Sequence, residues 1–121
     1  MGLCGEGMGE VKGNYSYEIK ELIKGYKKED IEYGKKLDFL IKRLKTDEKD
    51  ITNEILDCNN LSYTEKQSRN NEIRYALFFI YSRKKGRKYV VTFRDSKLRI
   101  ITAIPLGRRT LKRYRKKGLK A

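Results

Sequence analysis

Arginine, lysine and tyrosine are the residues of this sequence whose types and spacing suit chemistry on a phosphate. The chain contains no histidine, so an imidazole acid–base pair is excluded. Guanidinium groups bind phosphate oxygens two at a time and stay charged at any working pH. Arg74, Arg94 and Arg99 lie in or beside predicted strands. Alternation along those strands allows them to share one face as a phosphate clamp. The alternative is the solvated side of a half-buried sheet.

Two clusters of positive charge follow in the second half of the chain. They are the segment "RKKGRK" at 83–88 and the stretch 108–120, which contains no carboxylate. Such clusters bind a nucleic-acid backbone by releasing its counterions; the alternative is a solvated run of charge. The candidate nucleic-acid-binding residues are Arg83, Lys84, Lys85, Arg87, Arg94, Arg108, Arg109, Lys112, Arg113 and Arg115.

The charge is divided unequally along the chain, whose net charge is +14. Residues 1–72 contain 13 Lys and Arg against 15 Asp and Glu, a net charge of −2. Residues 73–121 contain 17 Lys and Arg against the single carboxylate of Asp95, a net charge of +16. This division gives the molecule an electrostatic field with a positive side. Such a field suits a polyanion, either a nucleic acid or an acidic protein.

Aromatic residues alternate with these cations. Tyr75, Tyr81, Tyr89 and Phe93 suit stacking on splayed RNA bases, or packing against helices that cover one face of the sheet. Tyr81 and Tyr89 flank the 83–88 turn, and we expect them to be the most exposed of the four.

Other catalytic patterns are missing from the sequence. There is no Ser–His–Asp set and no Gly-rich phosphate loop. Cys4 and Cys58 form no CxxC pair, which predicts free thiols, no metal site and no cofactor. Asp47, Glu48 and Asp50 are interpreted as the charge bias of a helix start.

Three helices are predicted in the first half of the chain. Residues 15–26 form an apolar stripe after Asn14, a candidate N-cap. Residues 35–45 place Leu37, Leu40, Ile41 and Leu44 on one helical face. A third helix begins at Thr46 or Asp47 and ends before "CNN" at 58–60.

Strands are predicted in the second half. Residues 61–67 suit a short edge strand, followed by strands at 73–82, 88–94 and 97–104. "DS" at 95–96 suits a two-residue hairpin. Strict alternation predicts that Arg99, Ile101 and Ala103 share a face.

These elements predict an α+β fold, with two to three N-terminal helices packed on a three- to four-stranded antiparallel sheet. We expect a disordered tail at 1–13, one domain at 14–107, and a basic C-terminal tail or short helix at 108–121. The last segment has few apolar residues beyond Leu111 and Tyr114, which predicts weak attachment. The longest uncharged apolar run, at 75–82, is too short to span a membrane, and we expect a cytoplasmic protein without a membrane partner.

Two segments together carry a family resemblance. "FLIKRLKTDEKDITNEIL" and "RYALFFIYSRKKGRKYVVTFRDSKLRIITAIPLGRR" resemble the RelE/BrnT-like group of toxin-type ribonuclease folds, over residues 37–110. The resemblance implies helices on a small antiparallel sheet whose basic face engages RNA. The matching positions are Arg43, Arg74, Tyr75, Arg99 and Thr102. Many members carry a histidine where this chain has Phe39.

The resemblance and the charge together predict an RNA-binding domain, with toxin-type endoribonuclease activity as the further step. The candidate catalytic residues are Arg43, Arg74 and Arg99 as phosphate ligands, and Lys88 or Tyr75, with Lys45 as an alternative, as the group that moves the 2′-hydroxyl proton. The expected partners are RNA or the ribosome, together with an acidic antitoxin. The alternatives are a non-enzymatic module on a ribonucleoprotein and an interaction domain that docks an acidic protein.

Overall fold

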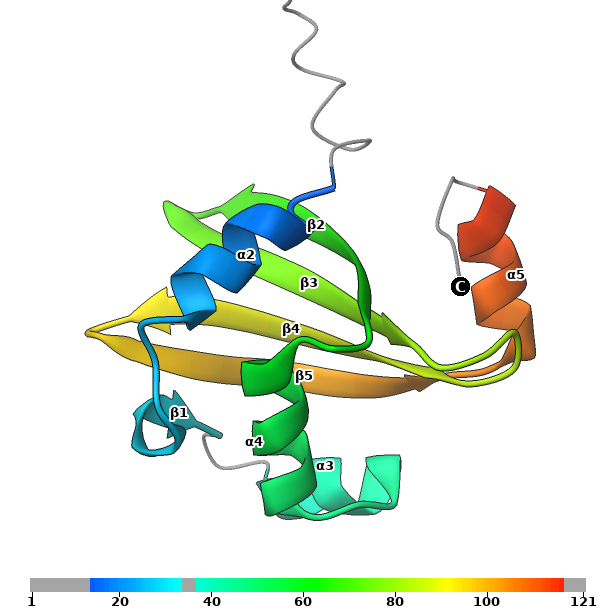
Figure 1. Ribbon diagram of the computed structural model, residues 1–121, viewed down its shortest axis with the longest axis horizontal. Coiled ribbons are helices and arrows are strands. Elements are labelled where there is room, and N and C mark those ends of the chain that lie inside the picture. The colour runs from blue at the N-terminus through cyan, green and yellow to red at the C-terminus, as the bar shows by residue number, and fades with distance from the viewer. Residues whose placement is uncertain (1–13, 34–36, 117–121) are drawn as a thin grey trace, which may run out of the picture.

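A computed structural model describes residues 14–33 and 37–116, without the side chains of 69 and 114–116 (Figure 1). The predicted tail at 1–13 therefore lies outside the described residues. The helices are α2 (Ser16–Ile23), α3 (Leu37–Leu44), α4 (Glu48–Asp57) and α5 (Arg108–Lys116), with a 3-10 turn η1 (Lys28–Asp30). The strands are β1 (Ile31–Glu32), β2 (Leu61–Arg69), β3 (Glu72–Ile80), β4 (Gly86–Arg94) and β5 (Lys97–Leu106).

The strands form one mixed sheet in the order β1-β5-β4-β3-β2. Strands β2 to β5 are an antiparallel meander, with β2 at an edge as predicted. The fifth strand corrects the prediction of three or four antiparallel strands. It is β1, which pairs in parallel with β5 through Ile31 and Glu32. Two residues are too few to show an alternating pattern, so this strand has no signal in the sequence.

Two hairpin turns set the register of the meander. Asn70 and Asn71 connect β2 to β3, and Asp95 and Ser96 connect β4 to β5. All four residues have positive φ, between 51° and 64°. Turns with two left-handed residues match the twist of the flanking strands. The turn predicted at 95–96 is therefore confirmed.

The helices follow the predicted patterns with shorter bounds. Asp47 caps α4, because its carboxylate accepts a hydrogen bond of 2.7 Å from the Asp50 backbone N–H. The same helix ends at Cys58, which adopts the left-handed conformation (φ 56°). In α2, the Asn14 side chain accepts hydrogen bonds from the backbone N–H groups of Ser16 and Thr64, and so attaches the helix start to β2.

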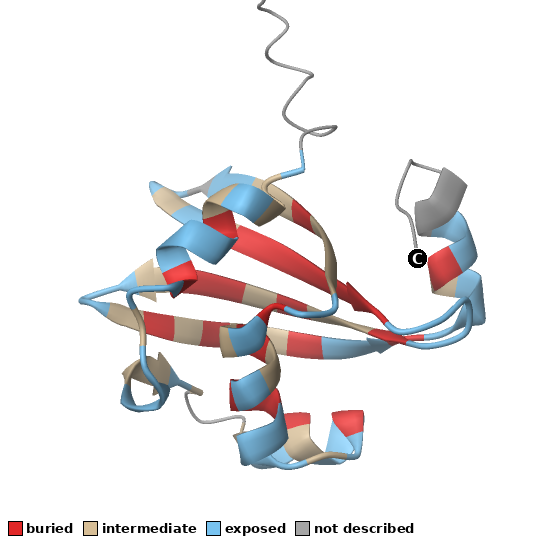
Figure 2. Cartoon of the chain, in the orientation of Figure 1, coloured by how far each residue is buried: buried red, intermediate tan, exposed pale blue. Residues whose placement is uncertain are grey.

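The main core lies between the sheet and helices α2, α3 and α4, on what we call the helical face (Figure 2). The sheet contributes alternate residues of each strand, such as Leu77 and Phe79 of β3. Each helix contributes its apolar stripe, such as Ile19 of α2, Leu40 of α3 and Ile51 of α4. Within the described ranges, no helix combines the length and the apolar composition that crossing a bilayer requires.

A second, smaller core lies on the opposite side of the sheet, which we call the α5 face. Leu111 of α5 is buried there, and the sheet contributes Leu106 and alternate residues of β3: Ala76, Phe78 and Ile80. The segment at 108–116 is therefore a docked helix, which corrects the expectation of a weakly held tail. One leucine in a nine-residue helix is enough because the sheet presents an apolar site for it.

A β-bulge corrects the predicted alternation in β5. Arg99 pairs with Thr92 and Ile100 with Val91, but Thr102 pairs with Val90, so the register shifts at Ile101. As a result, Ala103 is buried in the core of the helical face, opposite to the face of Arg99. Bulges of this kind place two residues of one strand opposite a single residue of its partner.

Candidate nucleic-acid interface

Two basic segments meet at one end of the sheet. Gly86 pairs with Ile80 on one side and with Leu106 on the other, so the β3–β4 turn lies beside the start of α5 (Figure 1). We call this surface the basic end. Its described cations, all on exposed residues, are Arg83, Lys84 and Lys85 of the turn and Arg108, Arg109, Lys112 and Arg113 of α5. The predicted contact Arg115 belongs to α5, but its side chain lies outside the described residues.

The β3–β4 turn is held by its own hydrogen bonds. The Ser82 hydroxyl accepts from the backbone N–H groups of Lys84 (3.1 Å) and Lys85 (3.2 Å). The Lys85 carbonyl accepts from the N–H groups of Tyr81 and Ser82. A Cβ on Gly86 would lie 2.8 Å from the Phe79 carbonyl oxygen, so only glycine fits this close approach. The turn thus presents its cations on an ordered backbone.

Arg74 and Arg99 lie in one cross-strand row. Both pair with Thr92 of the intervening strand β4, so the two arginines lie on the α5 face about 10 Å apart, the width of two strand spacings. The prediction that they share a face is confirmed. Within the described part of the chain, the Arg99 side chain has no hydrogen bond or ion pair.

Arg74 and Arg94 share one carboxylate. Arg74 Nε donates to Glu72 Oε1 at 2.9 Å, and Arg94 Nη2 donates to Glu72 Oε2 at 3.1 Å. The hydrogen bond from Arg74 is the main cause that lowers the pKa of Glu72, with Arg94 adding to it. The three residues carry a net charge of +1. No sequence motif marks Glu72 as the partner of these arginines.

Arg87 points away from the basic end, toward α4. Its guanidinium donates to Asp50 (2.9 Å), Glu54 (3.2 Å) and the Tyr89 hydroxyl (3.2 Å), and its side chain is only 17% exposed. The Tyr89 and Tyr81 hydroxyls both donate to Glu54. Burial is the main cause that raises the pKa of Tyr89, and the bond to Glu54 adds to it. The expectation that Tyr89 is exposed is therefore wrong, and Arg87 belongs to an internal network.

The five candidate catalytic residues do not form a single site. Tyr75 is buried on the helical face, where its hydroxyl donates to Glu18 at 2.6 Å. Burial raises the pKa of Tyr75, and the Glu18 bond raises it further. Tyr75 thus lies on the side of the sheet opposite to Arg74 and Arg99, which corrects its assignment as their partner.

The two remaining candidates also lie apart from the arginine row. Arg43 of α3 stacks on Phe39, with its guanidinium carbon 4.7 Å from the ring centroid, and donates to the Ala103 carbonyl oxygen. Lys88 lies on the α5 face with its Nζ 5.5 Å from the Phe78 ring centroid. It is four residues along β4 from Thr92, a distance of about 13 Å.

A cleft at the other end of the sheet is the feature that sequence reasoning missed. It has a volume of about 510 Å³ and lies between the end of α2, the start of β3 and the end of β4. The turn at Asn70 and Asn71 closes one side of it. A pair of asparagines between two strands is a hairpin signal, and it would have placed this turn. Among the described residues, no three His, Cys, Asp or Glu side chains lie close enough together to hold a metal ion.

Comparison with protein-family models, curated proteins and solved structures returned no match to this chain.

Proposed function

We propose that this chain binds single-stranded RNA through the basic end. The observation that carries the proposal is the meeting of two carboxylate-free segments, the β3–β4 turn and α5, at one end of the sheet. Together they present seven described cations to solvent. The RelE/BrnT-like resemblance points to the same ligand and to a basic sheet surface.

The physical basis is the release of counterions from a polyanion. Each phosphate neutralised by Lys or Arg frees condensed cations, and this gain does not depend on sequence. Hydrogen bonds hold the backbone of the turn, and the burial of Leu111 holds α5 in place. Because the cations are already positioned, binding loses less conformational entropy than it would from a free tail.

RNA suits this surface better than an acidic protein does. Protein interfaces centre on apolar anchors and are depleted of charge at their core. All the exposed residues of α5 in the described range are cationic, and its one buried apolar side chain faces the sheet. Phosphate contacts need only such cations.

The proposal covers binding and does not include cleavage. The predicted acid–base candidates, Tyr75 and Lys88, lie on the other face of the sheet or about 13 Å from the arginine row, so neither is placed to move a 2′-hydroxyl proton beside it. Lys88 and Arg99 instead continue the positive charge along the α5 face.

A charge-removal experiment tests the proposal. In the turn variant, Arg83, Lys84 and Lys85 are all changed to alanine. We expect its affinity for a labelled oligouridine to fall by about tenfold or more, the factor that about 1.4 kcal/mol represents. Fluorescence anisotropy at fixed salt measures the affinity.

The matched control changes Lys20, Lys42 and Lys49 to alanine. These exposed lysines lie on α2, α3 and α4, so the net charge falls by the same amount at another surface. We expect the control to bind RNA within about twofold of the parent, because the buffer salt screens the charges of these three distant lysines. Equal losses in the two variants, or tighter binding to polyglutamate than to RNA, would overturn the proposal.

A further inference from the structure

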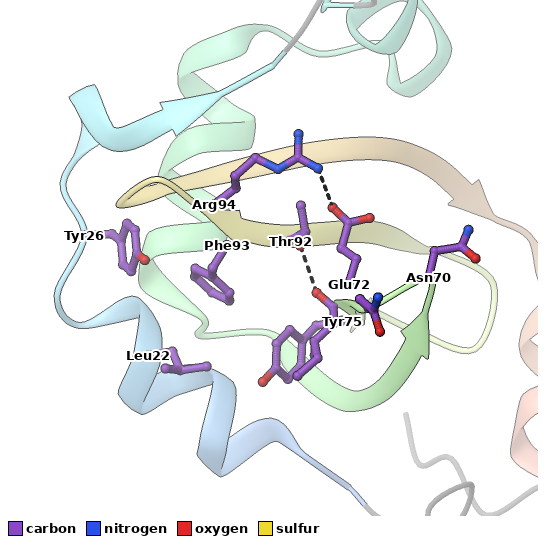
Figure 3. A pocket seen from close by; sticks show the side chains of 10 residues that line it. Leu22, Tyr26, Asn70, Glu72, Tyr75, Thr92, Phe93 and Arg94 are labelled. Carbon is purple, nitrogen blue, oxygen red and sulfur yellow. Dashed lines mark hydrogen bonds and ion pairs between the residues drawn. The ribbon is translucent and has the colours of Figure 1, made fainter.

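The cleft at the end of the sheet opposite the basic end is a candidate binding site (Figure 3). Leu22 comes from α2, and Tyr26 lies just past the end of that helix. Tyr75 comes from β3, and Phe93 from β4. Its volume of about 510 Å³ is within the range of pockets that hold small organic groups.

The lining of the cleft is aromatic and partly uncovered. The ring centroids of Tyr26 and Phe93 are 5.1 Å apart, and those of Phe93 and Tyr75 are 5.8 Å apart. Leu22 and Ile73 line the outer edge of the cleft and are 41% and 47% exposed. Tyr75 forms the floor of the cleft and is only 5% exposed, whereas Tyr26 and Phe93 are half-buried.

The rim of the cleft is polar and weakly positive. The turn residues Asn70 and Asn71 border the cleft, and each side-chain amide has both donors and an acceptor. Arg94 is 56% exposed at the rim, and the Glu72 carboxylate beside it is neutralised by Arg74 and Arg94. With two guanidinium groups and one carboxylate, this part of the rim carries a net charge of +1, which favours a phosphate at the mouth of the cleft.

We propose that this cleft holds a nucleobase of the bound RNA, an inference that rests on the proposed function. Proteins that recognise single-stranded RNA stack unpaired bases on aromatic rings and bind base edges with polar side chains. The ring of the base packs between Leu22, Ile73 and the aromatic wall. The turn at Asn70 and Asn71 supplies amide donors and acceptors at the rim for the edge of the base, and Arg94 contacts the adjoining phosphate.

The path between the two sites is lined with cations of the α5 face. From Glu72 to Ile80, strand β3 spans about 26 Å, the length of about eight stacked nucleotides. Lys88 lies in the half of this path nearer the basic end, and Arg74 and Arg99 lie in the half nearer the cleft. Arg74 donates to Glu72 of the rim, so the cationic path on the α5 face ends at the rim. The RNA strand must then pass over this end of the sheet to place a base against the aromatic wall, which lies on the helical face.

An RNA backbone without bases separates the two proposals. The probes are an oligouridine of about 12 nucleotides and a sugar-phosphate strand of the same length that carries no bases, both within the usual site sizes of single-strand binders. The two probes have equal charge. We expect the full-length parent to bind the base-bearing strand about tenfold more tightly, because stacking contributes about 1–3 kcal/mol per base.

Two variants locate this preference in the cleft. Tyr26→Leu keeps the apolar packing on Phe93 but removes the ring, and we expect the preference to fall to about twofold or less. Tyr17→Leu is the matched control, since Tyr17 is 77% exposed on α2 and does not line the cleft. We expect it to keep the parent's preference. Leu22→Glu is a second cleft variant at an exposed position, in case Tyr26→Leu fails to fold.

The outcomes are distinct. Equal binding of both probes, with the affinity still lost in the turn variant, overturns the base site and leaves the basic end as the RNA contact. Loss of the preference in Tyr17→Leu as much as in Tyr26→Leu also overturns it. No binding of either probe overturns the proposed function and the base site together.

Discussion

At the residue scale, internal partners decide which polar groups face a ligand. Arg87 and Tyr89 belong to strand β4 but are bound to Glu54 of α4, so neither faces solvent at the basic end. Removing one partner of such a network would leave another buried and unsatisfied. Arg99 has no partner among the described side chains, which leaves it able to contact a phosphate.

Cys58 carries a prediction about alkaline pH. The thiol is buried at the end of α4, and burial raises its pKa to about 11 from an ordinary value of 9.0. Between these values the unfolded chain loses a proton that the folded chain retains. The free energy of unfolding therefore falls as the pH rises from about 9 to about 11, by about 2 kcal/mol at most from this group.

Urea unfolding at pH 8 and at pH 10.5 measures this effect. The hydroxyls of the buried Tyr75 and Tyr89, whose pKa values are raised mainly by burial, add a similar loss above pH 10. We therefore expect Cys58→Ala to lose less stability over this interval than the parent does. The same loss in both proteins would show that the thiol does not titrate differently on folding.

At the element scale, α5 joins the proposed RNA contact to the fold. It presents its cations outward, and Leu111 packs on the residues that β3 and β5 place on the α5 face. A helix with one buried leucine depends strongly on that contact, because short helices are marginal on their own. A change that undocks α5 should therefore also lower the affinity for RNA.

Leu111→Ala tests this dependence. We expect it to lower the free energy of unfolding by about 2–3 kcal/mol, as expected for a large-to-small change in a core. Leu22→Ala is the stability control because Leu22 is 41% exposed, and we expect a loss below about 1 kcal/mol. RNA affinity should fall in Leu111→Ala even at temperatures where the protein stays folded. An unchanged stability would mean that α5 is not docked.

At the scale of the whole molecule, local patterns predicted more of the fold than of the site. The helix stripe at 37–44, the cap at Thr46 or Asp47 and the turn at 95–96 depend on neighbouring residues, so the sequence predicts all three; the structure places the cap at Asp47. Strand β1 and the bulge at Ile101 depend on distant partners, so no local pattern reveals them.

The site shows the same division. Alternation placed Arg74 and Arg99 on one face, but only the register shows that both pair with Thr92. The carboxylate partners of Arg87, Asp50 and Glu54, lie more than 30 residues away on α4, so no local pattern indicates the contact. The cleft is formed by three segments whose approach depends on the complete sheet.

The salt dependence of RNA affinity tests the central claim most directly. If the seven described cations of the basic end each neutralise about one phosphate, a plot of log affinity against log salt has a slope of about −5 for single-stranded RNA. The turn variant, with Arg83, Lys84 and Lys85 changed to alanine, should lower the magnitude of the slope by about 2. The Lys20, Lys42 and Lys49 control should leave it unchanged. A slope near zero in the parent, or the same slope in the parent and the turn variant, would contradict the account.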